Sequence, residues 1–88
     1  MTNFNAEMAK TNVNKYNESL RDRQLANAEM VTEEILEEVE NLSLEGRSVL
    51  SGYKVGFRAD LKIEDIVNKL KNLGFKATAI QGFVTVTW

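Results

Sequence analysis

The side chains that could take part in acid–base chemistry gather in the second half of the chain. Asp60, Glu64 and Asp65 are the only side-chain carboxylates after residue 46. Glu64 and Asp65 are neighbours on a predicted helix, so they point in different directions, which argues against a paired general acid and base. Their place in the first helical turn suits the helix dipole instead. Lys54 could act as a base only if it were buried, and the period-2 pattern around it places it outward.

The composition does not supply the usual catalytic partners for these groups. The chain has no histidine and no cysteine, which removes the commonest general base and the imidazole and thiolate metal ligands. The stretch from Gly52 to Gly56 lacks the glycine spacing and the following helix of a phosphate-binding loop. We therefore expect a protein that is not an enzyme and that uses no metal and no cofactor.

A candidate partner or ligand surface lies instead around the ends of the predicted strands. Lys54, Arg58 and Lys76 are cationic, and Ile80 and Phe83 flank a predicted turn. A polar sheet face with a basic and aromatic rim can bind single-stranded nucleic acid. The formal net charge of −2 and the small number of aromatic side chains argue against that ligand, so a protein partner is the expectation.

Charge divides the chain into two parts at Gly46. Residues 1–46 carry 4 Lys and Arg against 10 Asp and Glu, whereas residues 47–88 carry 7 against 3. This asymmetry indicates that the halves face different surroundings. We predict an acidic helical oligomerisation arm over residues 1–46 and a βαββ domain over residues 47–88, which together make an α+β protein.

The first half carries the apolar pattern of one long helix. It contains no proline, and its first glycine is Gly46, which is a good helix stop. A helix over residues 2–45 would be about 66 Å long, far more than the second half could cover. Steps of 4, 4 and 3 residues keep a stripe close to one face of a straight helix. The residues of this stripe that we assign to an oligomer interface are Val13, Tyr16, Leu20, Gln24, Ala28, Val31, Ile35, Val39 and Leu42.

Three arrangements of this helix remain open at the level of sequence. It could project and pair with copies of itself, and the polar Asn17 and Gln24 within the stripe favour this, because isolated buried amides can fix register. It could fold back near Asn27 into a helical hairpin. Its first residues, about 20 of them, could also be disordered, because they are rich in asparagine, a poor helix former.

An acidic run on this helix has two possible interpretations. Glu33, Glu34, Glu37, Glu38 and Glu40 crowd one and a half turns, with no Lys or Arg between Arg23 and Arg47. The plain reading is a solvated face opposite the apolar stripe. The sharper one is a docking surface for a basic partner, which could be the basic half of a neighbouring copy.

The second half predicts a βαββ unit. Alternation from Val49 to Arg58 is typical of a half-buried strand. A helix over about 62–73 follows, for which Asp60 is the predicted N-cap and Leu73-Gly74-Phe75 the predicted Schellman end. We place the 49–58 strand either beside the C-terminal strand or beside strand 75–80.

The last two strands form a predicted hairpin whose register follows from its turn. A two-residue Gln81-Gly82 loop pairs Ile80 with Phe83 and each residue further from the turn with its counterpart. One sheet face, which includes Phe75, Ala77, Ala79, Val84, Val86 and Trp88, then packs on the short helix. The other face stays uncovered, and we expect the long helix or a second copy to meet Ile80 and Phe83 there.

The segment from Asp60 to Thr78, followed by a strand that closes on Val86-Thr-Trp88, resembles small proteins encoded by tailed bacteriophages. Those chains often join an acidic N-terminal helix to a βαββ unit with a Leu-Gly-aromatic turn and a terminal Trp. The resemblance implies a virion accessory component, or a small factor that binds host machinery, and it carries over no catalytic or ligand residue.

The functional expectation follows from these features. No apolar run approaches the roughly 20 residues of a membrane span, and the first residues lack the regions of a signal peptide. We expect a phage structural or assembly protein, in the host cytoplasm or virion, that forms a homo-oligomer through its long helix. The alternative is a small effector that binds a host protein, or that captures a nucleotide or nucleic acid at an oligomer interface.

Overall fold

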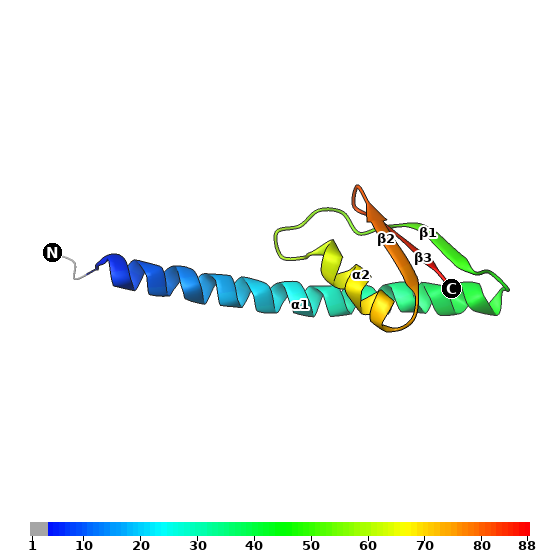
Figure 1. Cartoon of the computed structure of the whole chain (residues 1–88), viewed down its shortest axis with the longest axis horizontal. Helices are drawn as coiled ribbons and strands as arrows, with labels where there is room; N and C mark the ends of the chain where they lie inside the picture. The colour runs from blue at the N-terminus through cyan, green and yellow to red at the C-terminus, as the bar shows by residue number, and fades with distance from the viewer. Residues whose placement is uncertain (1–3) are drawn as a thin grey trace.

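The computed structural model describes residues 4–88 and confirms the α+β fold. Helix α1 covers Ala6–Leu44, strand β1 Val49–Lys54, helix α2 Ile63–Asn72, strand β2 Lys76–Ile80 and strand β3 Phe83–Thr87. The molecule is elongated, with Cα extents of 68 × 22 × 16 Å, because α1 runs well beyond the rest of the chain (Figure 1).

Helix α1 is continuous over 39 residues, so the predicted alternative of a hairpin near Asn27 is wrong. The Asn5 side chain caps its start by accepting a hydrogen bond from the Met8 amide at 3.0 Å. At its other end Gly46 takes a φ of +82°, and the Arg47 amide returns to the Leu42 carbonyl at 2.9 Å. These are the marks of a Schellman motif. Residues 2 and 3 of the predicted helix lie outside the described residues.

The three strands form one antiparallel sheet in the order β1-β3-β2. The hairpin register is confirmed, since Ile80 pairs with Phe83 and Ala77 with Val86 across the Gln81-Gly82 turn. Strand β1 lies beside β3, which is the first of the two predicted placements. The chain therefore closes with its last strand in the centre of the sheet.

Strand β1 is shorter than predicted and irregular. It ends at Lys54 rather than at residue 58, and its register shifts between Leu50 and Tyr53. Two residues, Ser51 and Gly52, there lie opposite one residue of β3, as in a β-bulge. Gly52 adopts a φ of +70°. The bulge turns both Leu50 and Tyr53 toward the core, which strict alternation did not predict.

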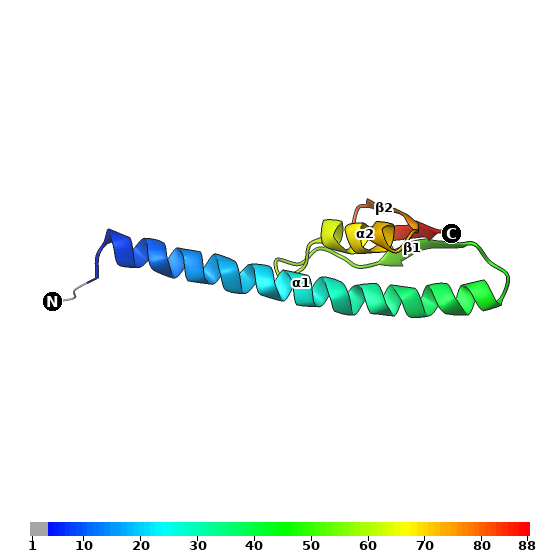
Figure 2. The same cartoon turned by 60° about the horizontal axis from the view of Figure 1, so that its bottom comes forward.

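Both helices cover the same face of the sheet. Ala77, Val84 and Val86 are buried on that face, together with Ile66 of α2 and Ile35 of α1. Helix α2 lies along β2, while α1 passes beside β1 and α2 (Figure 2). The long helix therefore does not cover the opposite face, where we expected it to meet Ile80 and Phe83, and these two side chains are 72% and 45% exposed.

Helix α2 begins without the predicted aspartate cap. Its N-cap is Lys62, whose side chain makes no capping bond. Asp60 is occupied elsewhere, because its carboxylate accepts two hydrogen bonds from Arg58 at 2.9 and 3.0 Å. The predicted Schellman end is confirmed, with Gly74 at a φ of +95° and the Phe75 amide bonded to the Leu70 carbonyl at 3.1 Å.

One core joins the second half of α1 to the rest of the chain. Ala28, Ile35 and Val39 belong to the same buried cluster as Leu70 and Val84. Gly46 therefore does not divide the molecule into two units as predicted. The division falls inside α1, near residue 20, and we call residues 6–20 the arm and residues 21–88 the body.

Candidate functional site

The arm is a helix without a covering layer. It extends straight out of the body in both views (Figures 1 and 2). Its apolar side chains are largely in solvent, with Met8 46%, Val13 57% and Tyr16 60% exposed, while Ala9 and Leu20 are half-buried. Val13, Tyr16 and Leu20 share one face of the helix, and exposed apolar side chains on one face are typical of an interaction surface.

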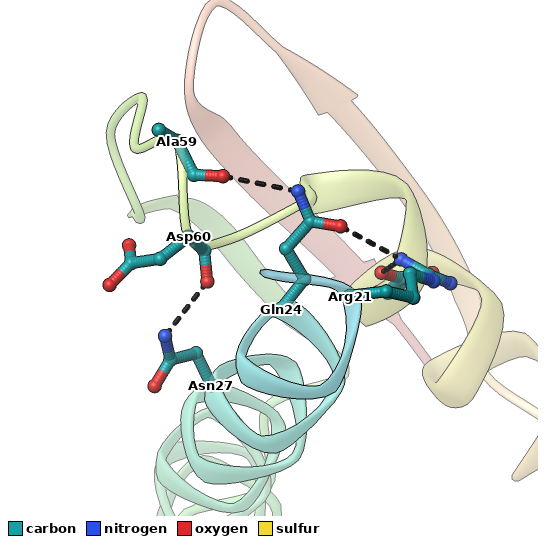
Figure 3. A network of polar contacts seen from close by, with 6 residues as sticks. Arg21, Gln24, Asn27, Ala59 and Asp60 are labelled. Atoms are coloured by element: carbon teal, nitrogen blue, oxygen red, sulfur yellow. Dashed lines mark hydrogen bonds and ion pairs between the residues drawn. The ribbon is translucent and has the colours of Figure 1, made fainter. Parts of the chain in front are cut away.

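A polar junction fixes the point where the arm leaves the body. Arg21 donates two hydrogen bonds to the Asp65 carboxylate of α2, at 2.6 and 2.9 Å. The Gln24 amide donates to the Ala59 carbonyl at 3.1 Å and accepts from Arg21 at 3.3 Å (Figure 3). Three residues further along α1, the Asn27 side-chain amide donates to the Asp60 carbonyl at 2.8 Å. These contacts hold the loop before α2 against one face of α1.

Gln24 therefore has a different role from the one predicted. It is 8% exposed and its amide satisfies a backbone carbonyl of its own chain. A buried amide needs such a partner, because leaving it unpaired would cost about 1–3 kcal/mol. The structure thus uses Gln24 to join α1 to the loop rather than to set register between copies.

Most of the predicted oligomer interface lies in the core of the chain itself. Ala28 and Ile35 have no exposed surface, and Val39 is 5% exposed. Val31 and Leu42 are half-buried. These positions do not face a partner in this fold, so the prediction is corrected there. The stripe positions that the structure leaves on the arm are Val13, Tyr16 and Leu20.

Ion pairs account for two of the three carboxylates that chemistry might have used. The Arg21 guanidinium hydrogen-bonds Asp65 and lowers the pKa of that carboxyl. Arg58 lowers the pKa of Asp60 in the same way. A carboxylate held ionised by an arginine is a poor proton donor near neutral pH. The geometry therefore favours a structural role for both.

The predicted partner surface is brought together only in part. Lys54 and Ile80 both pair with Phe83, from opposite sides of β3, and so form a small patch at the hairpin end of the open sheet face. Lys76 lies at the other end of β2. Arg58 lies in the loop after β1 and is paired with its own aspartate. We call Lys54, Ile80 and Phe83 the hairpin patch.

A groove beside β2 was missed at the level of sequence. It has a volume of about 570 Å³ and lies between the outer side of α2 and strand β2, with the 80% exposed Phe57 at one end. The predicted strand had assigned Phe57 to the sheet, but β1 ends before it. Gly56, with a φ of +81°, was the available signal that the chain turns there. Its lining includes Glu64, Val67, Lys71 and Ala79.

Comparison of the chain with protein-family models, curated proteins and solved structures finds no match. Over residues 4–88, no helix is both long and apolar enough to cross a membrane. In the same residues, no three carboxylates come together in a way that could hold a metal ion.

Proposed function

We propose that this chain is a structural or assembly protein that self-associates through the arm, within the phage context that the resemblance implies. The observation that carries the proposal is an apolar row, with Val13 and Tyr16 exposed and Leu20 half-buried, on a helix that continues into the core. The same helix is covered by α2 and the sheet along its second half. The arm lacks such a covering layer within the described chain, and a second arm provides one.

Helix energetics support a covered arm. An isolated helix of about 15 residues is marginal in water, and most helical stability in proteins comes from packing of an apolar face. The arm also contains Asn12, Asn14 and Asn17, which are poor helix formers. Pairing with a second copy buries the apolar row of both arms at once and stabilises both helices.

The junction favours one orientation of such a pair. In steps of four and three residues, the face that carries Tyr16 and Leu20 continues to Gln24 and Asn27. That face is already occupied there by the loop that contains Ala59. A parallel partner helix would run into this loop. An antiparallel partner meets this loop only with the first residues of its helix, and it leaves the two bodies at opposite ends of the pair.

Side-chain matching gives a register for the antiparallel pair. Placing Val13 across from Tyr16 of the second copy also places Ala9 across from Leu20 of that copy. Both of these layers are then apolar. The glutamates between Arg23 and Arg47 also stay far from those of the second copy. Such a pair is smaller than the roughly 1,200–2,000 Å² of a stable interface, so we expect a concentration-dependent dimer.

Disulfide cross-linking tests both the pairing and its orientation. The chain has no cysteine, so the variants Ala9→Cys and Leu20→Cys each carry a single thiol. In the antiparallel pair, a mixture of the two variants should form the mixed disulfide, while neither variant alone should cross-link. In a parallel pair the two positions lie about 16 Å apart along the axis, beyond the roughly 4.4–6.8 Å of bridged Cα atoms. Cross-linking of each variant with itself would therefore refute the orientation.

A charge placed in the seam tests the association itself. Val13→Glu introduces a carboxylate into the apolar row of both copies, and we expect it to abolish the mixed disulfide between the Ala9→Cys and Leu20→Cys variants. Asn14→Glu makes a similar acidic change on the side of the arm that faces away from the row, and should leave association unchanged. Formation of the mixed disulfide at the wild-type rate in chains that carry Val13→Glu would overturn the proposal.

The hairpin patch favours a second candidate function, binding of a host protein. Ile80 and Phe83 are exposed apolar side chains beside the cationic Lys54, a composition that suits an acidic and apolar partner surface. Under this alternative, Phe83→Ala and Lys54→Ala would abolish capture of the partner while the association state stays unchanged.

A further inference from the structure

The edge strand β2 lacks the features that protect sheet edges. Both β1 and β2 are edge strands, because β3 lies between them. The bulge at Gly52 interrupts β1. Strand β2 pairs one-to-one with β3 along Lys76–Ile80, contains no proline and carries a charge only at its first residue. Flat edges without bulges, prolines or central charges are templates for pairing with another strand.

The turn identifies which backbone groups of β2 face outward. Gln81 and Gly82 have φ values of +50° and +80°, as in a type I′ turn, which makes Ile80 and Phe83 a hydrogen-bonded pair. Alternation along the ladder then points the N–H and C=O groups of Ala77 and Ala79 away from β3. The hydrogen bonds that β3 makes on its other side agree with this alternation. There the Gly82 carbonyl accepts from the amide of residue 55 at 2.8 Å.

We propose that the β2 strands of two copies pair with each other, antiparallel, about a two-fold axis through Thr78. The outward groups fix this register, because each Ala77 exchanges both of its backbone hydrogen bonds with Ala79 of the second copy. Thr78 then lies directly opposite Thr78 of that copy. The two three-stranded sheets become one continuous sheet.

The charged and apolar side chains beside the edge of β2 are complementary across this two-fold axis. On the groove side of α2, Glu64 lies at one end and Lys71 at the other. Because the second copy runs in the opposite direction, Lys71 of one copy comes alongside Glu64 of the other, twice. On the open face, Lys76 lies opposite Ile80 of the second copy, so its aliphatic stem covers an exposed apolar side chain. Like charges do not face each other in this register.

This interface is separate from the arm. It uses β2 and the outer side of α2, whereas the arm leaves the body from the junction beside Asp65. If the arms pair, Val13→Glu in the full chain removes that contact and leaves the β2 contact to be measured alone. If the arms do not pair, the self-association of the Val13→Glu chain is the same as that of wild type. Failure of one proposal therefore leaves the other open to measurement.

A single introduced thiol tests the axis directly. Residues opposite each other in a non-hydrogen-bonded antiparallel pair have Cβ atoms about 4.5–5.5 Å apart, near the range that a disulfide bridges. In the Val13→Glu background, Thr78→Cys should form a disulfide dimer on mild oxidation. Thr87→Cys, which is also exposed but lies on the central strand, should form no disulfide dimer. The absence of a Thr78→Cys dimer, or equal cross-linking at both positions, would overturn the proposal.

Charge reversal provides an independent measurement on chains without thiols. In the same background, Lys71→Glu places two glutamates together at each end of the interface. Glu64→Lys places two lysines there. Each should weaken the dimer about fivefold to tenfold, and the double variant should restore it. Lys54→Glu makes the same charge change on β1 and should have no effect. Self-pairing would be refuted if the double variant dimerised no more tightly than either single variant. It would also be refuted if the Val13→Glu chain with an unchanged β2 stayed monomeric at about 1 mM, and the edge would then be left to a strand of another protein.

Discussion

A small deletion in the core should cost more stability than a larger deletion on the arm, although both lie in one helix. Ile35 has no exposed surface and lies among buried side chains of α2 and the sheet. Ile35→Val removes one methylene there and should cost about 0.5–1.5 kcal/mol. Val13 is 57% exposed, so Val13→Ala should change the free energy of unfolding of the monomer by less than about 0.5 kcal/mol. Alanine is also the better helix former.

Urea denaturation at low protein concentration measures this contrast without a contribution from self-association. Trp88 is a suitable reporter, because it lies half-buried in the body with its ring edge-to-face against Phe75 at 6.4 Å. With a slope of about 1 kcal/mol per molar urea, Ile35→Val should lower the midpoint by about 1 M. An unchanged midpoint for Ile35→Val, or a larger shift for Val13→Ala, would show that α1 does not pack on the body as described.

Two titrations test the electrostatics of the body. Arg21 lowers the pKa of Asp65, so the ion pair stabilises the fold above the unfolded value of about 4 and this contribution is lost as pH falls through the folded value. Asp65→Asn should therefore lower the urea midpoint at pH 7, and the difference from wild type should vanish in acid; a difference independent of pH would contradict this. Burial, and then the Glu34 carboxylate at 3.3 Å, raise the pKa of Tyr53. In a Tyr16→Phe background, Glu34→Gln should lower the pH at which the remaining tyrosine ionises in ultraviolet absorbance, and an unchanged titration would refute the contact.

Local sequence signals were sufficient for much of the body. The two-residue turn at Gln81-Gly82 determines the whole hairpin register, because each pair follows from the one before it. Gly46 and Gly74 end their helices in the conformation that glycine adopts most easily. In each case the determining residues are neighbours in sequence, so the physics that selects the structure is local.

Features that depend on competition between partners were not predictable in this way. Asp60 is of the right type for an N-cap, but α2 begins at Ile63, so the cap position falls on Lys62. Arg58 offers the aspartate a bidentate ion pair and takes the carboxylate. The bulge at Gly52 likewise depends on the fit of β1 against Thr85, whose hydroxyl accepts a hydrogen bond from the Gly52 amide at 3.2 Å. The sequence of a strand taken alone shows the alternation of its apolar and polar residues, but not its fit against the neighbouring strand.

The stripe on α1 shows why sequence periodicity identifies a helix face but not what covers it. Val13 and Ile35 belong to the same stripe and are chemically alike, yet one is exposed and the other buried. The difference arises because the second half of the chain is long enough to cover only part of the helix. Gln24 is the informative position, since an amide within an apolar stripe needs a polar acceptor wherever it is buried. The sequence shows that such an acceptor must exist, but an acceptor on a second copy would satisfy the amide equally well. Only the folded chain, by placing the Ala59 carbonyl 3.1 Å from that amide, shows that the acceptor belongs to the same chain and that cover by the rest of the chain begins there.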